Sequence, residues 1–147
     1  MSNPTIDYSC SSRSFGFDNL LYQVEVKIIK GDCAGIEANL TMPPSPGEPY
    51  GNVPPWLNFC QDGYFQPGTG SYAFSSFIRQ GQNQTNLIAI LVDGNDIFLY
   101  INRQYLGSSQ LVLDKKGSTV FEVLVKGEAN DLVQTEGVFS NLQVWKL

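Results

Sequence analysis

Residues 87–102 read LIAILVDGNDIFLYIN, which is two apolar runs joined by the polar residues 93–96. Glycine and asparagine adopt positive φ more readily than other residues, so Gly94 and Asn95 suit the two-residue turn of a β-hairpin. The stretch therefore predicts a tight antiparallel hairpin centred on these two residues.

The two arms of this hairpin share a face of branched aliphatic side chains. The register set by the turn pairs Val92 with Ile97, Ile90 with Leu99, and Ile88 with Ile101. The opposite face is also mostly apolar and carries Leu87, Ala89, Leu91, Phe98, Tyr100 and Asn102. A hairpin with two largely apolar faces is expected in the middle of a sheet and not at its edge.

The rest of the chain alternates apolar and polar residues in short runs, such as residues 20–29 (LLYQVEVKII) and 137–147 (GVFSNLQVWKL). Glycine, proline and asparagine separate these runs, and no window combines a helical stripe with capping residues. About ten short strands predict an all-β fold with almost no helix. We expect a concanavalin A-like jelly-roll sandwich of two antiparallel sheets, with a barrel of similar size as the alternative.

The chain has 147 residues, of which 42% are hydrophobic, and this suits one globular domain. We expect residues 1–14 to be an N-terminal segment, in part an artificial start of the chain. Residues 15–147 are then a single β-sandwich domain. Prolines crowd residues 43–55, which predicts a long surface loop within that domain.

Fourteen acidic and nine basic residues give a formal net charge of -5, and the basic residues are scattered. This pattern argues against a nucleic-acid partner. No apolar run approaches the roughly 20 residues of a membrane span, so we expect no membrane contact by this segment. A secretion signal or an anchor in a parent protein remains compatible with the sequence.

The chain contains three cysteines, Cys10, Cys33 and Cys60, and no histidine. We expect one disulfide, between Cys10 and Cys33, and one buried thiol, with three reduced thiols as the alternative. Metal binding by these cysteines is not expected, because no C-x-x-C pair and no histidine occur.

Catalysis is not expected. A glycosidase needs two carboxylates across a sugar ring, and the strand pattern E-x-D-x-x-E is absent from this sequence. Nucleophilic chemistry based on Ser-His or Cys-His pairs is excluded by the lack of histidine. Asp93, Asn95 and Asp96 could supply oxygen ligands to a structural calcium ion, but a tight turn demands the same residue types. We therefore expect no cofactor and keep calcium as the less favoured alternative.

Binding of a carbohydrate is the favoured chemistry, because aromatic rings stack on sugar faces beside a few polar groups. The candidate ligand-binding residues lie in or next to loops, or on the outer face of the hairpin: Trp56, Asn58, Asp62, Tyr64, Tyr72, Arg79, Tyr100 and Asn102. The competing interpretation is that single aromatic residues of this set fill core or edge positions.

Several motifs occur in the order of a known family. They are FDNLLYQVEV at residues 17–26, GDCAGI at 31–36, NFCQDGY at 58–64, the hairpin at 86–102 and FSNLQVW at 139–145. In these motifs the chain resembles bacterial concanavalin A-like lectin/glucanase domains of the laminin-G-like or keto-disaccharide-hydrolase-like kind. Such domains occur in secreted proteins and in the outer parts of receptor-type serine/threonine kinases.

The resemblance implies a non-catalytic, extracytoplasmic module that binds a glycan or serves as a sensor, at an extracellular or cell-surface location. A saccharide hydrolase of the same fold and a structural or protein-interaction spacer are the alternatives. The chain also departs from the family. Relatives often carry an aromatic residue followed by arginine where this chain has Ala38 and Asn39.

Overall fold

The structure is a computed structural model that describes seven stretches of the chain. They are residues 5–15, 19–41, 56–67, 70–94, 96–110, 118–128 and 135–147. Side chains are described for residues 19–36, 57–67, 70–94, 96–108 and 135–147. The proline-rich loop predicted at residues 43–55 lies outside these ranges.

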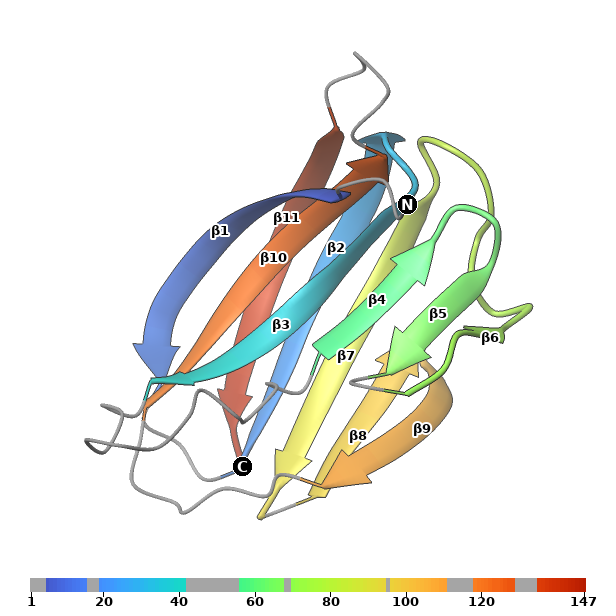
Figure 1. The fold of residues 1–147 in the computed structure, drawn as a ribbon. Coiled ribbons are helices and arrows are strands. Elements are labelled where there is room, and N and C mark those ends of the chain that lie inside the picture. Colours follow the sequence, from blue (N-terminus) through green and yellow to red (C-terminus); the bar gives the residue numbers. More distant parts are fainter. Residues whose placement is uncertain are drawn as a thin grey trace, which may run out of the picture.

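The described chain forms two antiparallel sheets that pack face to face (Figure 1). The six-stranded sheet has the order β1 (Thr5–Phe15), β10 (Ser118–Glu128), β3 (Cys33–Thr41), β4 (Trp56–Cys60), β5 (Tyr64–Pro67), β6 (Ala73–Phe74). The five-stranded sheet has the order β11 (Glu136–Lys146), β2 (Leu20–Lys30), β7 (Thr85–Asp93), β8 (Asp96–Ile101), β9 (Gln104–Gln110). The prediction of an all-β jelly-roll sandwich is confirmed, and the described residues include no helix.

None of the described segments is a helix of the length and apolar character that crossing a membrane requires.

Strand β1 lies almost wholly within residues 1–14, which the sequence analysis treats as an N-terminal segment. Its residues Thr5–Phe15 pair with β10, from Thr5 opposite Glu128 to Phe15 opposite Thr119. The N-terminal segment is therefore part of the six-stranded sheet. Its sequence, TIDYSCSSRSF, is polar and lacks a regular apolar alternation, but an edge strand needs only one partner for its backbone groups.

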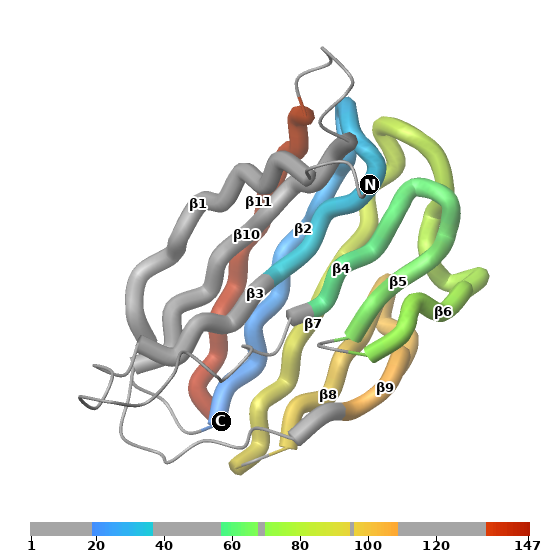
Figure 2. The backbone as a smooth tube through the Cα atoms, in the orientation of Figure 1, coloured from blue at the N-terminus to red at the C-terminus, as the bar shows by residue number. Residues whose placement is uncertain are grey.

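The hairpin of β7 and β8 has the predicted register. Asp93 lies opposite Asp96, and Gly94 in the turn has a φ of 62°. All three aliphatic pairs form as predicted: Val92 with Ile97, Ile90 with Leu99, and Ile88 with Ile101. Strands β2 and β9 flank the hairpin, so it lies inside the five-stranded sheet as expected. Figure 2 shows the two arms of the hairpin, β7 and β8, within this sheet.

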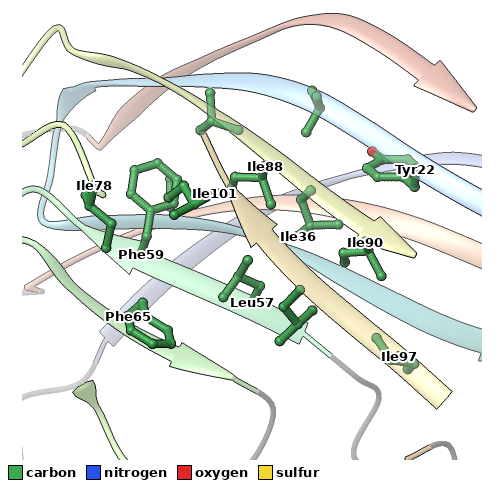
Figure 3. Packing of buried hydrophobic residues seen from close by; sticks show 14 of the residues in the cluster. Tyr22, Ile36, Leu57, Phe59, Phe65, Ile78, Ile88, Ile90, Ile97 and Ile101 are labelled. Carbon is green, nitrogen blue, oxygen red and sulfur yellow. The ribbon is translucent and has the colours of Figure 1, made fainter. Parts of the chain in front are cut away.

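The hydrophobic core lies between the two sheets (Figure 3). The five-stranded sheet contributes alternate residues of β2, β7 and β8, and the six-stranded sheet contributes residues of β3, β4 and β5. Its largest fully buried side chains are Tyr22, Phe59, Leu20, Ile36, Leu57, Ile88, Ile90, Ile97, Leu99, Ile101 and Val24. Each buried aliphatic side chain stabilises the fold by roughly 1.5–3 kcal/mol through removal from water.

Tyr22 makes the free energy of unfolding depend on pH in the alkaline range. It is 1% exposed, and burial raises the pKa of its phenol from 10.0 to about 12. The unfolded chain therefore ionises first, and stability that is complete below pH 10 is lost as pH rises towards 12. We expect a loss of about 2–3 kcal/mol, measured by urea unfolding at a series of pH values. Tyr22→Phe should remove this part of the pH dependence, and an unchanged slope in that variant would contradict the assignment.

Candidate functional site

The candidate site lies on the outer face of β4, β5 and β6. Leu57 and Phe59 of β4 point into the core, so Asn58 between them faces away from it. Phe65 of β5 also points inwards, which places its neighbours Tyr64 and Gln66 outside. On the side of these strands away from the core lies a surface that we call the aromatic face. Tyr64, Gln66 and Phe74 lie at this surface, the exposed Tyr72 directly precedes β6, and Asn58 lies beneath the surface without exposure to solvent.

Two aromatic rings dominate this surface. Tyr64 lies opposite Phe74, and their rings meet edge to face with centroids 5.7 Å apart. Tyr64 is 46% exposed and Phe74 is 55% exposed. Large rings exposed side by side are typical of a binding surface, because water solvates them poorly.

Gly63 allows the ring of Phe74 to lie close to the chain. Its φ of 90° favours glycine, and a Cβ atom there would lie 2.7 Å from Cε2 of Phe74. The Ser75 N–H donates to the Gly63 carbonyl at 2.9 Å and fastens β6 to this turn. The absence of a side chain at Gly63 thus leaves room for the Phe74 ring, and the hydrogen bond between Ser75 and Gly63 holds the β6 backbone next to this turn.

Asn58 is the buried polar group of the aromatic face. It is 0% exposed, and neither its Nδ2 nor its Oδ1 has a hydrogen-bond partner. Gly35 of β3 lies directly opposite, and a Cβ atom added to Gly35 would collide with Oδ1 of Asn58. The amide therefore lies across the backbone of Gly35. Buried polar groups are nearly always hydrogen-bonded, so this one is exceptional.

Two neighbouring polar side chains are engaged with the backbone. Nε2 of Gln66 donates to the carbonyl of Gly70 at 2.8 Å. Oδ1 of Asp62 accepts from the N–H of Tyr64 at 3.2 Å, as aspartate commonly does in turns. Asp62 thus shapes the turn that presents Tyr64.

The disulfide differs from the predicted one. Cys33 is bonded to Cys60, which lies directly opposite on the neighbouring strand, with the two Cα atoms 3.9 Å apart. The adjacent Gln61 N–H donates to the Asp32 carbonyl, so the cysteines occupy a non-hydrogen-bonded position, where opposing residues are closest.

The predicted Cys10–Cys33 pairing is wrong for a topological reason. Cys10 lies on β1 opposite Val123 of β10, and β10 separates β1 from β3. Two strand spacings amount to about 9–10 Å, whereas a disulfide joins Cα atoms no more than about 7 Å apart. The prediction failed because the sequence does not show which strands become neighbours.

Asn102 and Arg79, both predicted to bind ligand, make hydrogen bonds within the protein. Nδ2 of Asn102 donates to the carbonyl of Phe77 at 2.7 Å and to Oδ1 of Asn86 at 2.8 Å, and its Oδ1 accepts from Leu87 N–H. Asn86 also bonds the backbone N–H and carbonyl of Arg79. The side chain of Asn102 is thus already bonded through both its nitrogen and its oxygen.

Arg79 is engaged in a similar way, since one guanidinium nitrogen donates to the carbonyl of Thr85 at 3.1 Å. Asn86 was not singled out in the sequence, yet it is the buried centre of this network. Its position directly before the apolar run of residues 87–92 was the available signal.

Tyr100 lies on the other sheet. It alternates with the core residues of β8 and therefore faces outwards from the five-stranded sheet, where its ring meets Tyr105 at 5.7 Å. The structure thus brings Asn58, Tyr64 and Tyr72 to one side of the sandwich and Tyr100 to the other. Trp56 begins β4, but its side chain lies outside the described residues.

Phe74 and Gln66 were not among the predicted site residues. Of Tyr72, Phe74 and Ile78, which lie close together in the sequence, only Ile78 is buried. The signal that could have found Phe74 is the pairing of two short strands across the turn at Gly63, which is visible only once their register is known.

Two of the residues considered for calcium, Asp93 and Asp96, belong to the hairpin, and Asn95 lies outside the described residues. Asp93 and Asp96 lie opposite each other at the end of the hairpin, and the Gly94 N–H donates to Oδ1 of Asn19 at 2.7 Å. Within the described ranges, no group of three or more histidine, cysteine, aspartate or glutamate residues is placed to hold a metal ion.

The two packed antiparallel sheets define the fold as a concanavalin A-like jelly-roll sandwich. No family model matches the chain, and no curated protein matches its sequence. Its structure is similar to sheep galectin-11, with a TM-score of 0.55, 13% identity and 99% of each chain covered. It is also similar to the carbohydrate binding module CBM66 of Bacillus subtilis, with a TM-score of 0.53, 10% identity, and coverage of 94% of this chain and 81% of that one.

A sialidase of Trypanosoma rangeli is similar over 88% of this chain but only 20% of its own, with a TM-score of 0.58 and 11% identity. The chain thus spans about a fifth of that sialidase. At these identities the likeness concerns the fold alone.

Proposed function

We propose that this protein is a glycan-binding module whose ligand lies on the aromatic face. The observation that carries the proposal is the exposed, edge-to-face pair of Tyr64 and Phe74 next to the buried, unpaired amide of Asn58. Sugar rings present C–H faces to aromatic rings and hydroxyl groups to amides, so this combination matches their chemistry. Galectin-11 and the carbohydrate binding module with the same fold support the proposal at the level of fold.

The finer proposal is a non-catalytic, extracytoplasmic module, of the kind found in bacterial lectin/glucanase domains, with a sensory or adhesive role. The motifs quoted from the sequence support this part. The sequence lacks the paired carboxylates of a retaining glycosidase, and Asp62 at the aromatic face is engaged in a turn. A saccharide hydrolase is the second candidate, because about a fifth of a sialidase chain is similar to this fold. Release of new reducing ends from a bound oligosaccharide would favour it.

The proposal is tested by glycan-array screening followed by calorimetric titration with the best neutral oligosaccharide. Tyr64→Ala and Phe74→Ala should each weaken binding about tenfold, which corresponds to the roughly 1.4 kcal/mol expected for one stacking ring. Both rings are exposed, so the variants should remain folded.

Tyr105→Ala is the matched control. Tyr105 is 53% exposed and also forms an edge-to-face pair at 5.7 Å, but on the outer face of the opposite sheet. It should leave the affinity unchanged. Equal losses of affinity in Tyr64→Ala and Tyr105→Ala would refute the aromatic face as the site. Failure of the wild-type protein to bind any glycan would refute the proposed function and favour a spacer role.

A further inference from the structure

Asn58 carries an energetic cost, because its side-chain amide is buried without a hydrogen-bond partner. Both polar atoms of its side chain are removed from water and have no partner within the protein. An apolar side chain of similar volume would avoid this cost, as buried polar pairs replaced by apolar groups often show. Unpaired buried groups in native proteins frequently mark functional positions.

Asn58 lies between two neighbouring strands of the six-stranded sheet. Gly35 of β3 lies on one side and Gln66 of β5 on the other. Because Gly35 has no side chain, the amide of Asn58 lies across the β3 backbone. The side of Asn58 away from Gly35 is therefore the side of β5, which carries Tyr64 and Gln66 of the aromatic face.

We propose that Asn58 is the specificity-determining residue of the aromatic face, and that its amide turns outwards to bind two neighbouring hydroxyl groups of a neutral glycan. This inference rests on the proposed glycan-binding function. The amide nitrogen donates to one hydroxyl oxygen, and the amide oxygen accepts from the other hydroxyl group. The ligand thus supplies the partners that the protein itself does not provide.

The polar groups described around this face favour an uncharged sugar. Asn58 and Gln66 are neutral amides that match hydroxyl groups, and Asp62 is a carboxylate in the turn next to Tyr64. The formal net charge of the chain is -5. A uronate or a sialylated sugar would be repelled by this carboxylate and by the overall charge.

The test compares the wild-type protein with Asn58→Leu, whose side chain has a similar volume and no polar atom. Thermal unfolding should occur at a higher temperature in Asn58→Leu, because the unpaired buried groups are gone. Calorimetric titration with the best neutral gluco- or galacto-oligosaccharide should show binding about 10- to 100-fold weaker, as expected for two lost hydrogen bonds.

Deoxy analogues of the same oligosaccharide test the inference on the unaltered protein. Removal of one hydroxyl of the bound pair should weaken binding to the wild type about tenfold and leave binding to Asn58→Leu unchanged. Sialylated and uronate-containing oligosaccharides should bind more weakly than the neutral ones. If Asn58→Leu does not fold, the wild-type protein still provides a test, because equal affinity for every deoxy analogue and the parent sugar would overturn the inference.

Three results would overturn the inference. Asn58→Leu could bind as tightly as the wild type, it could unfold at a lower temperature with unchanged binding, or anionic sugars could bind best. The second result would identify Asn58 as a structural residue paired with an internal water molecule. If Tyr64→Ala weakens binding and Asn58→Leu does not, only the role of Asn58 fails. If no glycan binds the wild-type protein, the proposed function and this inference fail together.

Discussion

Gly35→Ala is expected to lower the free energy of unfolding by about 3 kcal/mol, at the upper end of the cost of overpacking. The added Cβ atom would collide with the carbonyl oxygen of Leu57 and with Oδ1 of Asn58, and it would lie 3.0 Å from the Cα atom of Asn58. A side chain can move aside, but the Leu57 carbonyl belongs to the β4 backbone. Strands β3 and β4 would have to separate where the core residues Ile36 and Leu57 meet. Urea unfolding monitored by circular dichroism measures the effect.

Gly107→Ala is the matched control for this variant. Gly107 also lies within a strand, β9, but a Cβ atom added there would have no neighbour within 4 Å. Alanine restricts the unfolded chain more than glycine does, so this variant should be neutral or up to about 1 kcal/mol more stable. Equal changes in unfolding free energy in the two variants would contradict the view that the close approach of β3 and β4 requires glycine at position 35.

Removal of the Cys33–Cys60 disulfide is the other large effect. The bridge closes a sequence separation of 27 residues, for which the chain-entropy model gives about 3–4 kcal/mol. We expect the double variant Cys33→Ala, Cys60→Ala to lose this amount of unfolding free energy. Its melting temperature should fall by about 10 °C, since each kcal/mol shifts a chain of this size by roughly 2–4 °C.

Cys10→Ala is the control, because the bridge does not include Cys10. It should unfold at the wild-type temperature within about 2 °C, as most substitutions away from special features do. Alkylation of the denatured but unreduced protein, followed by peptide mass spectrometry, should label Cys10 alone. Labelling of Cys60 with protection of Cys10 would instead support the pairing that the sequence suggested.

The sequence predicted the β7–β8 hairpin in detail because the contacts that form it are local. The turn residues and the alternating side chains lie within one stretch of 16 residues, and the register predicted from the turn is the register observed. The buried side of β2 could also be predicted from the sequence, because successive residues of a strand point alternately to its buried side and its exposed side. Together these strands make most of the core contribution of the five-stranded sheet.

The six-stranded sheet was harder to predict because its neighbours are far apart in the sequence. Strand β10 lies between β1 and β3, an arrangement that no local pattern reveals. Both the N-terminal boundary and the disulfide partner of Cys33 depended on that order. The candidate site also depended on strand pairing. Residue type alone was enough to select Asn58, Tyr64 and Tyr72, but Phe74 could be added only once the register of β5 and β6 was known.

The sequence by itself determined that this protein is a β-sandwich, which residues of its central hairpin are buried, and that aromatic and amide residues were available for a ligand. The physical reason is that turn propensity and side-chain alternation are properties of neighbouring residues. Only the tertiary structure decided that Cys33 joins Cys60, that Asn102 is used internally, and that the Asn58 amide is buried without a partner. Two features depend on the arrangement of the whole chain: which distant strands pair, and whether a buried polar group finds a hydrogen-bond partner. Neither feature can be predicted from a short stretch of sequence.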